Sequence, residues 1–151
     1  MVTWLGLSAY FLIVLSHFSI EADIQIEQVR GKEKMNVMLW IVQIILAAGF
    51  VYSGWMKTIR IESSTKTWAW VNDVPKSLVV LIGIAELLGA LGIVLPWALN
   101  IAPVLTPITA IALAVVALLG MLFHISRKEY REIGVNIFFI VLTLIVAFGR
   151  L

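Results

Sequence analysis

The chain has 151 residues, of which 62% are hydrophobic and 13% are charged, and its formal net charge is +2. Soluble domains hold about 45–50% apolar and about 25% charged residues, so this chain has more apolar surface than a soluble core can bury. The composition excludes a soluble domain and gives no support to nucleic-acid binding. It indicates an integral membrane protein whose main partner is the lipid bilayer.

The chain has no Cys, and its only His residues are His17 and His124. The lack of thiols excludes disulfides, thiol redox chemistry and iron–sulfur clusters carried by this chain alone. Two His residues argue against a bis-His haem within one subunit. We therefore expect no metal site, and any electrons would be carried by a ligand or by a partner protein.

Residues 1–34 form an N-terminal extension that is open to three interpretations. The run Trp4–Ile20 is apolar but short, and no Lys or Arg precedes it. A signal-like segment and a membrane anchor forming a fifth span are two interpretations. The third is a mis-assigned start, because "GKEKM" before Met35 can be encoded by a purine-rich run that resembles a bacterial ribosome-binding site.

Four apolar segments are long enough for transmembrane helices, which need about 20 residues each. They lack two-residue alternation, so the helix is the structure that satisfies their backbone in lipid. The expected spans are Val37–Met56, Ser77–Leu99, Thr106–Ile125 and Gly134–Phe148. The predicted fold is an all-α integral membrane protein, a four-transmembrane-helix bundle, with an additional N-terminal hydrophobic helix left open.

Basic residues concentrate in two of the loops. From Met35 onward, seven Lys and Arg residues lie in the loops after the first and third spans, and only Arg150 lies on the other side. The positive-inside rule places these two basic loops in the cytoplasm.

Polar side chains from four spans are expected in the basic half of the membrane. Glu86 lies ten residues beyond Lys76, which is about 15 Å deep at 1.5 Å per residue. A carboxylate in hydrocarbon is costly, so Glu86 is a candidate functional residue, with a structural hydrogen bond as the alternative. We expect Lys57 to extend to lipid phosphate and Asn136 to hydrogen-bond between helices. Estimated depths that differ by about 10 Å argue against a direct bond between Glu86 and His124.

Small residues gather at the depth of Glu86. A periodicity of 3.6 residues places one set on a single face of the third span, namely Thr106, Ala110, Leu113, Ala117, Gly120 and His124. This pattern predicts close helix packing, a cavity beside Glu86, or both. In the first loop, Trp68 and Trp70 suit an interfacial anchor. The alternative is a loop that covers the mouth of the polar cluster.

Several segments between Met35 and Leu151 carry a family resemblance. They are "SGWMK", "WVNDVP", "GIAELLGALGIVLP", "LTPITAIALAVVALLGMLFHISRKEY" and Asn136 in the fourth span. In this order and spacing they resemble the DoxX-like family of small four-span bacterial membrane proteins, so we expect a DoxX-like domain over residues 35–151. The resemblance implies a multi-pass protein of the bacterial inner membrane. Some members of the family are tied to thiosulfate–quinone oxidoreduction or to membrane oxidoreductase complexes.

Three functions remain open, and so does the question of whether the chain is an enzyme. The first is the membrane subunit of a redox system that binds a quinone, with a soluble or membrane oxidoreductase as partner. Glu86 and His124 would then be catalytic, by polarising or protonating its carbonyls. The expected ligand-binding residues are Lys57, Trp70, Asn72, Arg127 and Asn136. The second function is a proton-coupled transporter that works through Glu86 as a homodimer. The third is a scaffold or assembly factor with no chemistry.

Overall fold

The computed structural model describes the backbone of residues 2–151 and the side chains of residues 16–151. It divides into two compact units, Met1–Met38 and Leu39–Leu151. The side chains described in the first unit, from Ser16 to Met38, are exposed. Most of the apolar run Trp4–Ile20 lies outside the described side chains, and so do the interpretations that depend on it.

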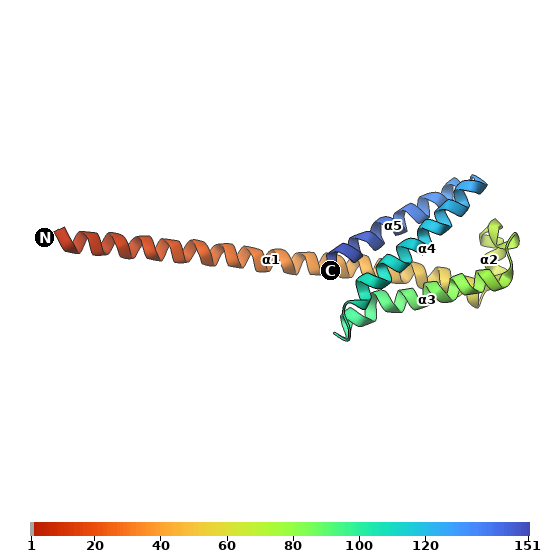
Figure 1. Ribbon diagram of the computed structural model, residues 1–151, viewed down its shortest axis with the longest axis horizontal. Helices are drawn as coiled ribbons and strands as arrows, with labels where there is room; N and C mark the ends of the chain where they lie inside the picture. Colours follow the sequence, from red (N-terminus) through yellow and green to blue (C-terminus); the bar gives the residue numbers. More distant parts are fainter. Residues whose placement is uncertain (1) are drawn as a thin grey trace. The chain divides into compact units, whose positions relative to one another are not determined.

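The described residues are helical and contain no strand. The elements, labelled in Figure 1, are α1 (Val2–Thr58), α2 (Ile61–Thr67), the 3-10 helix η1 (Ala69–Asn72), α3 (Lys76–Ala98), α4 (Leu105–Arg127) and α5 (Tyr130–Gly149). Four helices are long and apolar enough to cross a membrane, namely α3, α4, α5 and α1 from Ser16 to Thr58. The all-α, four-span membrane fold is therefore confirmed. α5 begins four residues before the expected start of the fourth span, and the two short helices of the first loop were not predicted.

α4 ends just before a residue with a left-handed backbone conformation, and the chain turns there into α5. Lys128 has φ 59°, a conformation that costs a residue other than Gly roughly 1–2 kcal/mol. Its N–H donates to the carbonyl of Ile125, and the N–H of Glu129 donates to the carbonyl of His124. These two bonds form a Schellman motif, which satisfies the last carbonyls of the helix. The motif also brings the side chain of Glu129 back beside His124.

The second unit packs through one face of each helix. The buried residues of α4 include Thr106, Ala110, Leu113, Ala117 and His124, which confirms the expected face except for Gly120, which is half-buried. The apolar core joins α1, α3, α4 and α5 through Leu46, Phe50, Ala90, Ile93, Leu113 and Val146. The opposite faces are rich in exposed Leu, Ile, Val and Phe, as expected for helices surrounded by lipid.

α1 and α3 meet backbone to backbone at two glycines. A Cβ added to Gly54 would lie 2.7 Å from the carbonyl oxygen of Gly83, and one added to Gly83 would lie 2.9 Å from that of Gly54. This is the close approach that small residues permit between membrane helices. Lys57 follows Gly54 by three residues and Glu86 follows Gly83 by three. Side chains three residues apart share a helix face, so the glycine contact brings Lys57 and Glu86 together.

A polar network closes the other end of this unit. The side-chain amide of Gln43 donates to the carbonyl of Ile93 at 2.5 Å, and Arg150 Nε donates to Gln43 Oε1 at 2.9 Å. The Arg150 guanidinium lies 4.3 Å from the ring centroid of Trp97 and 5.3 Å from that of Trp40. The network joins α1, α3 and the end of α5. Arg150, the one Lys or Arg on this side of the membrane from Met35 onward, is buried.

Candidate functional site

A buried ion pair lies where α1 and α3 approach each other. Lys57 Nζ donates to Glu86 Oε1 at 2.6 Å, and the two side chains are 9% and 8% exposed. The expectation that Lys57 extends to lipid phosphate is therefore wrong, because its ammonium finds a carboxylate inside the bundle. Burying either charge alone would be costly, and the pairing offsets that cost.

Two tryptophans of the first loop cover the ion pair. Lys57 Nζ lies 5.6 Å from the ring centroid of Trp68 and 5.7 Å from that of Trp70, within the range of cation–π attraction. The Trp70 ring also packs edge-on against His124 and Phe123, with centroid distances of 5.9 and 6.0 Å. Trp70 is buried, so it acts as a cover over the polar cluster rather than as an interfacial anchor.

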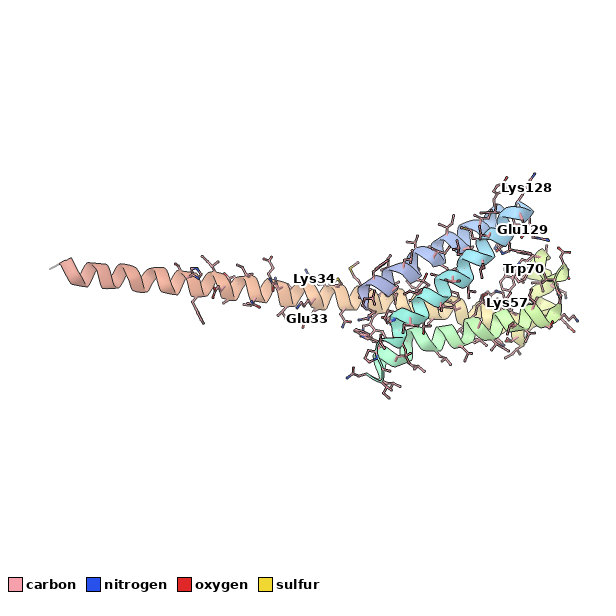
Figure 2. All side chains as sticks on the ribbon, in the orientation of Figure 1. Glu33, Lys34, Lys57, Trp70, Lys128 and Glu129 are labelled. Carbon is pink, nitrogen blue, oxygen red and sulfur yellow. The ribbon has the colours of Figure 1, made fainter. Side chains whose placement is uncertain are left out.

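A second charged cluster joins this loop to the turn between α4 and α5. His124 Nδ1 lies 2.6 Å from Glu129 Oε2, and Arg127 Nε donates to Glu129 Oε1 at 2.8 Å. Arg127 also donates to Asp73 Oδ2 at 2.5 Å. The two basic loops therefore meet at one end of the unit. Figure 2 shows Lys57, Trp70 and Glu129 following one another across this end.

A cavity of about 420 Å³ lies between α1, α3, α4 and α5, beneath these tryptophans. This volume falls within the range of about 300–1,000 Å³ that is typical of small-molecule sites. Most of the lining is apolar or aromatic, and the polar lining residues are Ser53, Lys57, Glu86, His124, Glu132 and Asn136. Ala117 and Gly120 leave room on the α4 side. Close packing at Gly54 and Gly83 and a cavity beside Glu86 therefore occur together.

Within the described part of the chain, Glu86 Oε2 is buried and has no hydrogen-bond partner. A buried acceptor without a partner costs about 1–3 kcal/mol, and more for a charged group. Glu86 lines the cavity, so a molecule with a hydrogen-bond donor would complete its coordination. This carboxylate oxygen is the strongest indication of a ligand site.

Comparison with protein families identifies the chain. A family model described as the DoxX-like family matches residues 41–146. The chain belongs to the DoxX-like family. No curated protein and no solved structure matches it. The matched range of the DoxX-like protein contains Lys57, Trp70, Glu86 and His124, and thus both charged clusters.

Five of the seven residues singled out in the sequence line the cavity, namely Lys57, Trp70, Glu86, His124 and Asn136. The other two, Asn72 and Arg127, hold the loop that carries Trp68 and Trp70 in place. The Asn72 amide donates to the carbonyls of Thr65 and Ala69 within the loop. Arg127 binds the acids at the loop contact. The expected interhelical bond of Asn136 is wrong, because its amide donates to the carbonyl of Glu132 in its own helix at 2.8 Å.

Sequence reasoning missed Asp73 and Glu129, the two acids of the loop contact. The available signal was the presence of acids in otherwise basic loops, since isolated Asp and Glu there can pair with neighbouring Arg. Ser53 and Glu132, which also line the cavity, were missed as well.

The Glu129 cluster predicts an acid-dependent loss of stability. Burial acts to raise the pKa of Glu129, but hydrogen bonds from Arg127 and His124 outweigh it and hold that pKa below its usual range. A carboxylate with a lowered folded-state pKa stabilises the fold above its unfolded pKa of about 4.3. This stabilisation disappears as the pH falls through the folded-state value. We therefore expect the apparent Tm of the wild type in detergent to fall below about pH 4, and Glu129→Gln to lack this part of the decline.

The exposed Glu62 of α2 provides the control, because Glu62→Gln should keep the wild-type pH profile. Identical profiles for Glu129→Gln and the wild type would show that Glu129 adds nothing to the pH dependence.

Proposed function

We propose that this DoxX-like protein binds a lipid-soluble, quinone-like molecule in the cavity beside Glu86, as the membrane subunit of a redox system. The observation that supports this most is a mainly apolar space of about 420 Å³ with a buried carboxylate oxygen that lacks a partner. Ligand sites are typically apolar spaces with a few polar groups that fix orientation. The quinone class matches the association that the family resemblance implies.

The lining suggests a role for each part of such a ligand. Phe50, Phe139 and Trp70 offer ring faces and edges against which a flat ring packs. Glu86 and His124 would hold its oxygen substituents and exchange protons with them. Lys57 keeps Glu86 in place and balances its charge. Because a quinone exchanges electrons with a redox centre, the proposal includes a soluble or membrane oxidoreductase as partner.

The proposal concerns residues 35–151, with residues 1–34 as an extension. It places the protein in the inner membrane of a bacterium, with the two basic loops in the cytoplasm, either alone or as a homodimer. Proton-coupled transport and a purely structural role are the alternatives.

Two neighbouring valines of α4 provide the test. Val116 lines the cavity, whereas Val115 is 50% exposed on the lipid-facing side. We expect protein purified from its own membrane in mild detergent to carry a quinone-like molecule, detected by solvent extraction and mass spectrometry. Val115→Trp should retain this molecule, and Val116→Trp should lose it because the larger side chain fills the cavity.

Both variants should unfold at temperatures close to that of the wild type, so that ligand loss is not a consequence of misfolding. If the wild type and Val116→Trp carry the same molecules in the same amounts, the cavity is not the ligand site. A scaffold would then be favoured, because a scaffold has no need of a ligand.

A further inference from the structure

One buried polar atom of the cavity wall lacks a hydrogen-bond partner in the described part of the chain. Glu86 Oε1 accepts a bond from Lys57, while Oε2 is buried and has no partner within the described residues. A carboxylate offers about four acceptor positions, whereas an ammonium offers three hydrogens. One hydrogen of Lys57 is used by Glu86, and the rings of Trp68 and Trp70 face the ammonium. Of the polar atoms in this pair, Oε2 is the one that has no hydrogen-bond partner within the described residues, and it is an acceptor.

Other polar residues that line the cavity also offer hydrogen-bond acceptors. The Asn136 amide nitrogen donates to the carbonyl of Glu132, which orients the carboxamide so that Oδ1 faces Gly120, another lining residue. Its remaining oxygen is an acceptor. Glu132 is also a lining residue, and a carboxylate is acceptor-only when ionised. His124 Nδ1 is already bonded to Glu129.

The positive and negative charges of the cavity wall cancel beside Glu86. Lys57 and Glu86 form a pair 2.6 Å apart, so a ligand needs no net charge to bind beside them. The terminal torsion of a glutamate is soft, so a small rotation of the carboxylate presents Oε2 to a ligand in the cavity. An uncharged molecule with an O–H group fits this wall, whereas a molecule with only carbonyl oxygens leaves Oε2 without a partner.

We propose that the cavity selects the hydroxyl form of its ligand, a quinol or another phenol, whose O–H donates to Glu86 Oε2. This inference rests on the proposed function, because it requires that the cavity bind an aromatic molecule. It adds that the reduced form is the one held, with Glu86 as the selecting residue.

Three uncharged probes of nearly the same shape test the inference: tetramethylphenol, its methyl ether, and duroquinone. Binding to the purified protein in detergent is measured by isothermal titration calorimetry. Leaving a buried charged acceptor unpaired weakens binding substantially, so we expect the phenol to bind about 10- to 100-fold more tightly than the ether or the quinone. In the charge-balanced double variant Lys57→Met with Glu86→Met, this preference should vanish.

The outcomes separate this inference from the proposed function. Equal affinity for the three probes, lost in Val116→Trp, would overturn the hydroxyl preference and leave the cavity as the ligand site. A phenol preference that persists in the double variant would overturn the role of Glu86. If none of the three probes binds the wild-type protein, both the inference and the proposed function fail.

Discussion

Replacing Lys57 by Met is expected to destabilise the protein by about 3–5 kcal/mol, because it removes one partner of a buried ion pair. Glu86 would be left 6% exposed among apolar side chains. Its carboxylate must then stay ionised in apolar surroundings without a counter-charge or take up a proton, and both alternatives cost free energy. Met keeps the length and apolar character of the Lys side chain, so packing under Trp68 and Trp70 is preserved as far as a substitution allows.

The double variant Lys57→Met with Glu86→Met should recover most of this loss. Replacing both members of a buried pair by apolar residues is often neutral or stabilising, because neither charge remains to be buried. The unfolding free energy of the wild type, both single variants and the double variant, measured in lipid–detergent micelles, gives the coupling between the residues. Strictly additive losses would mean that the two charges do not stabilise each other.

The fold could be predicted from the sequence because the apolar segments that indicate membrane-spanning helices are long. Four apolar blocks and a lack of strand alternation were enough to predict the four membrane-spanning helices, and the buried face of α4 followed from helical periodicity alone. The small residues at the depth of Glu86 predicted close packing, a cavity or both, and both occur: Gly83 packs against α1, while Ala117 and Gly120 line the cavity. These features depend on one helix at a time, which is what a single sequence displays best.

The site was accessible only in part, because its contacts join separate helices. Counting residues from the loops places Lys57 at the membrane boundary, and such counting contains no information on which helix faces it. The pairing with Glu86 depends on the contact between Gly54 and Gly83, a register that periodicity does not supply. The bond between His124 and Glu129 depends on the left-handed Lys128, and Lys carries no signal for that conformation.

The second large effect is expected for Gly83→Ala, because there is no room for a methyl group between α1 and α3. The added Cβ would lie 2.8 Å from the Cβ of Lys57, 2.9 Å from the carbonyl oxygen of Gly54 and 2.9 Å from Cγ2 of Thr58. Two of these atoms belong to or lie next to the backbone, so the helices must separate. Overpacking of this kind costs about 1–3 kcal/mol, occasionally more.

Gly134→Ala in α5 is the matched control, because a Cβ at Gly134 meets nothing within 4 Å. Ala is favoured over Gly in a helix by up to about 1 kcal/mol, so this change should be neutral or stabilising. The unfolding free energies of both variants, measured in the same micelles as the Lys57 series, provide the comparison. Equal effects of the two substitutions would mean that α1 and α3 are not in close contact.

The two large effects should also be coupled, since the glycine contact holds the ion pair together. If Gly83→Ala moves α1 away from α3, the distance between Lys57 and Glu86 grows and less of their mutual stabilisation remains. The loss caused by Lys57→Met should then be smaller in the Gly83→Ala background than in the wild type, by an amount in the range of about 0.5–3 kcal/mol seen for residues in contact. An unchanged loss would show that the ion pair holds its geometry independently of the glycines. The close approach of α1 and α3 would then be a matter of packing alone.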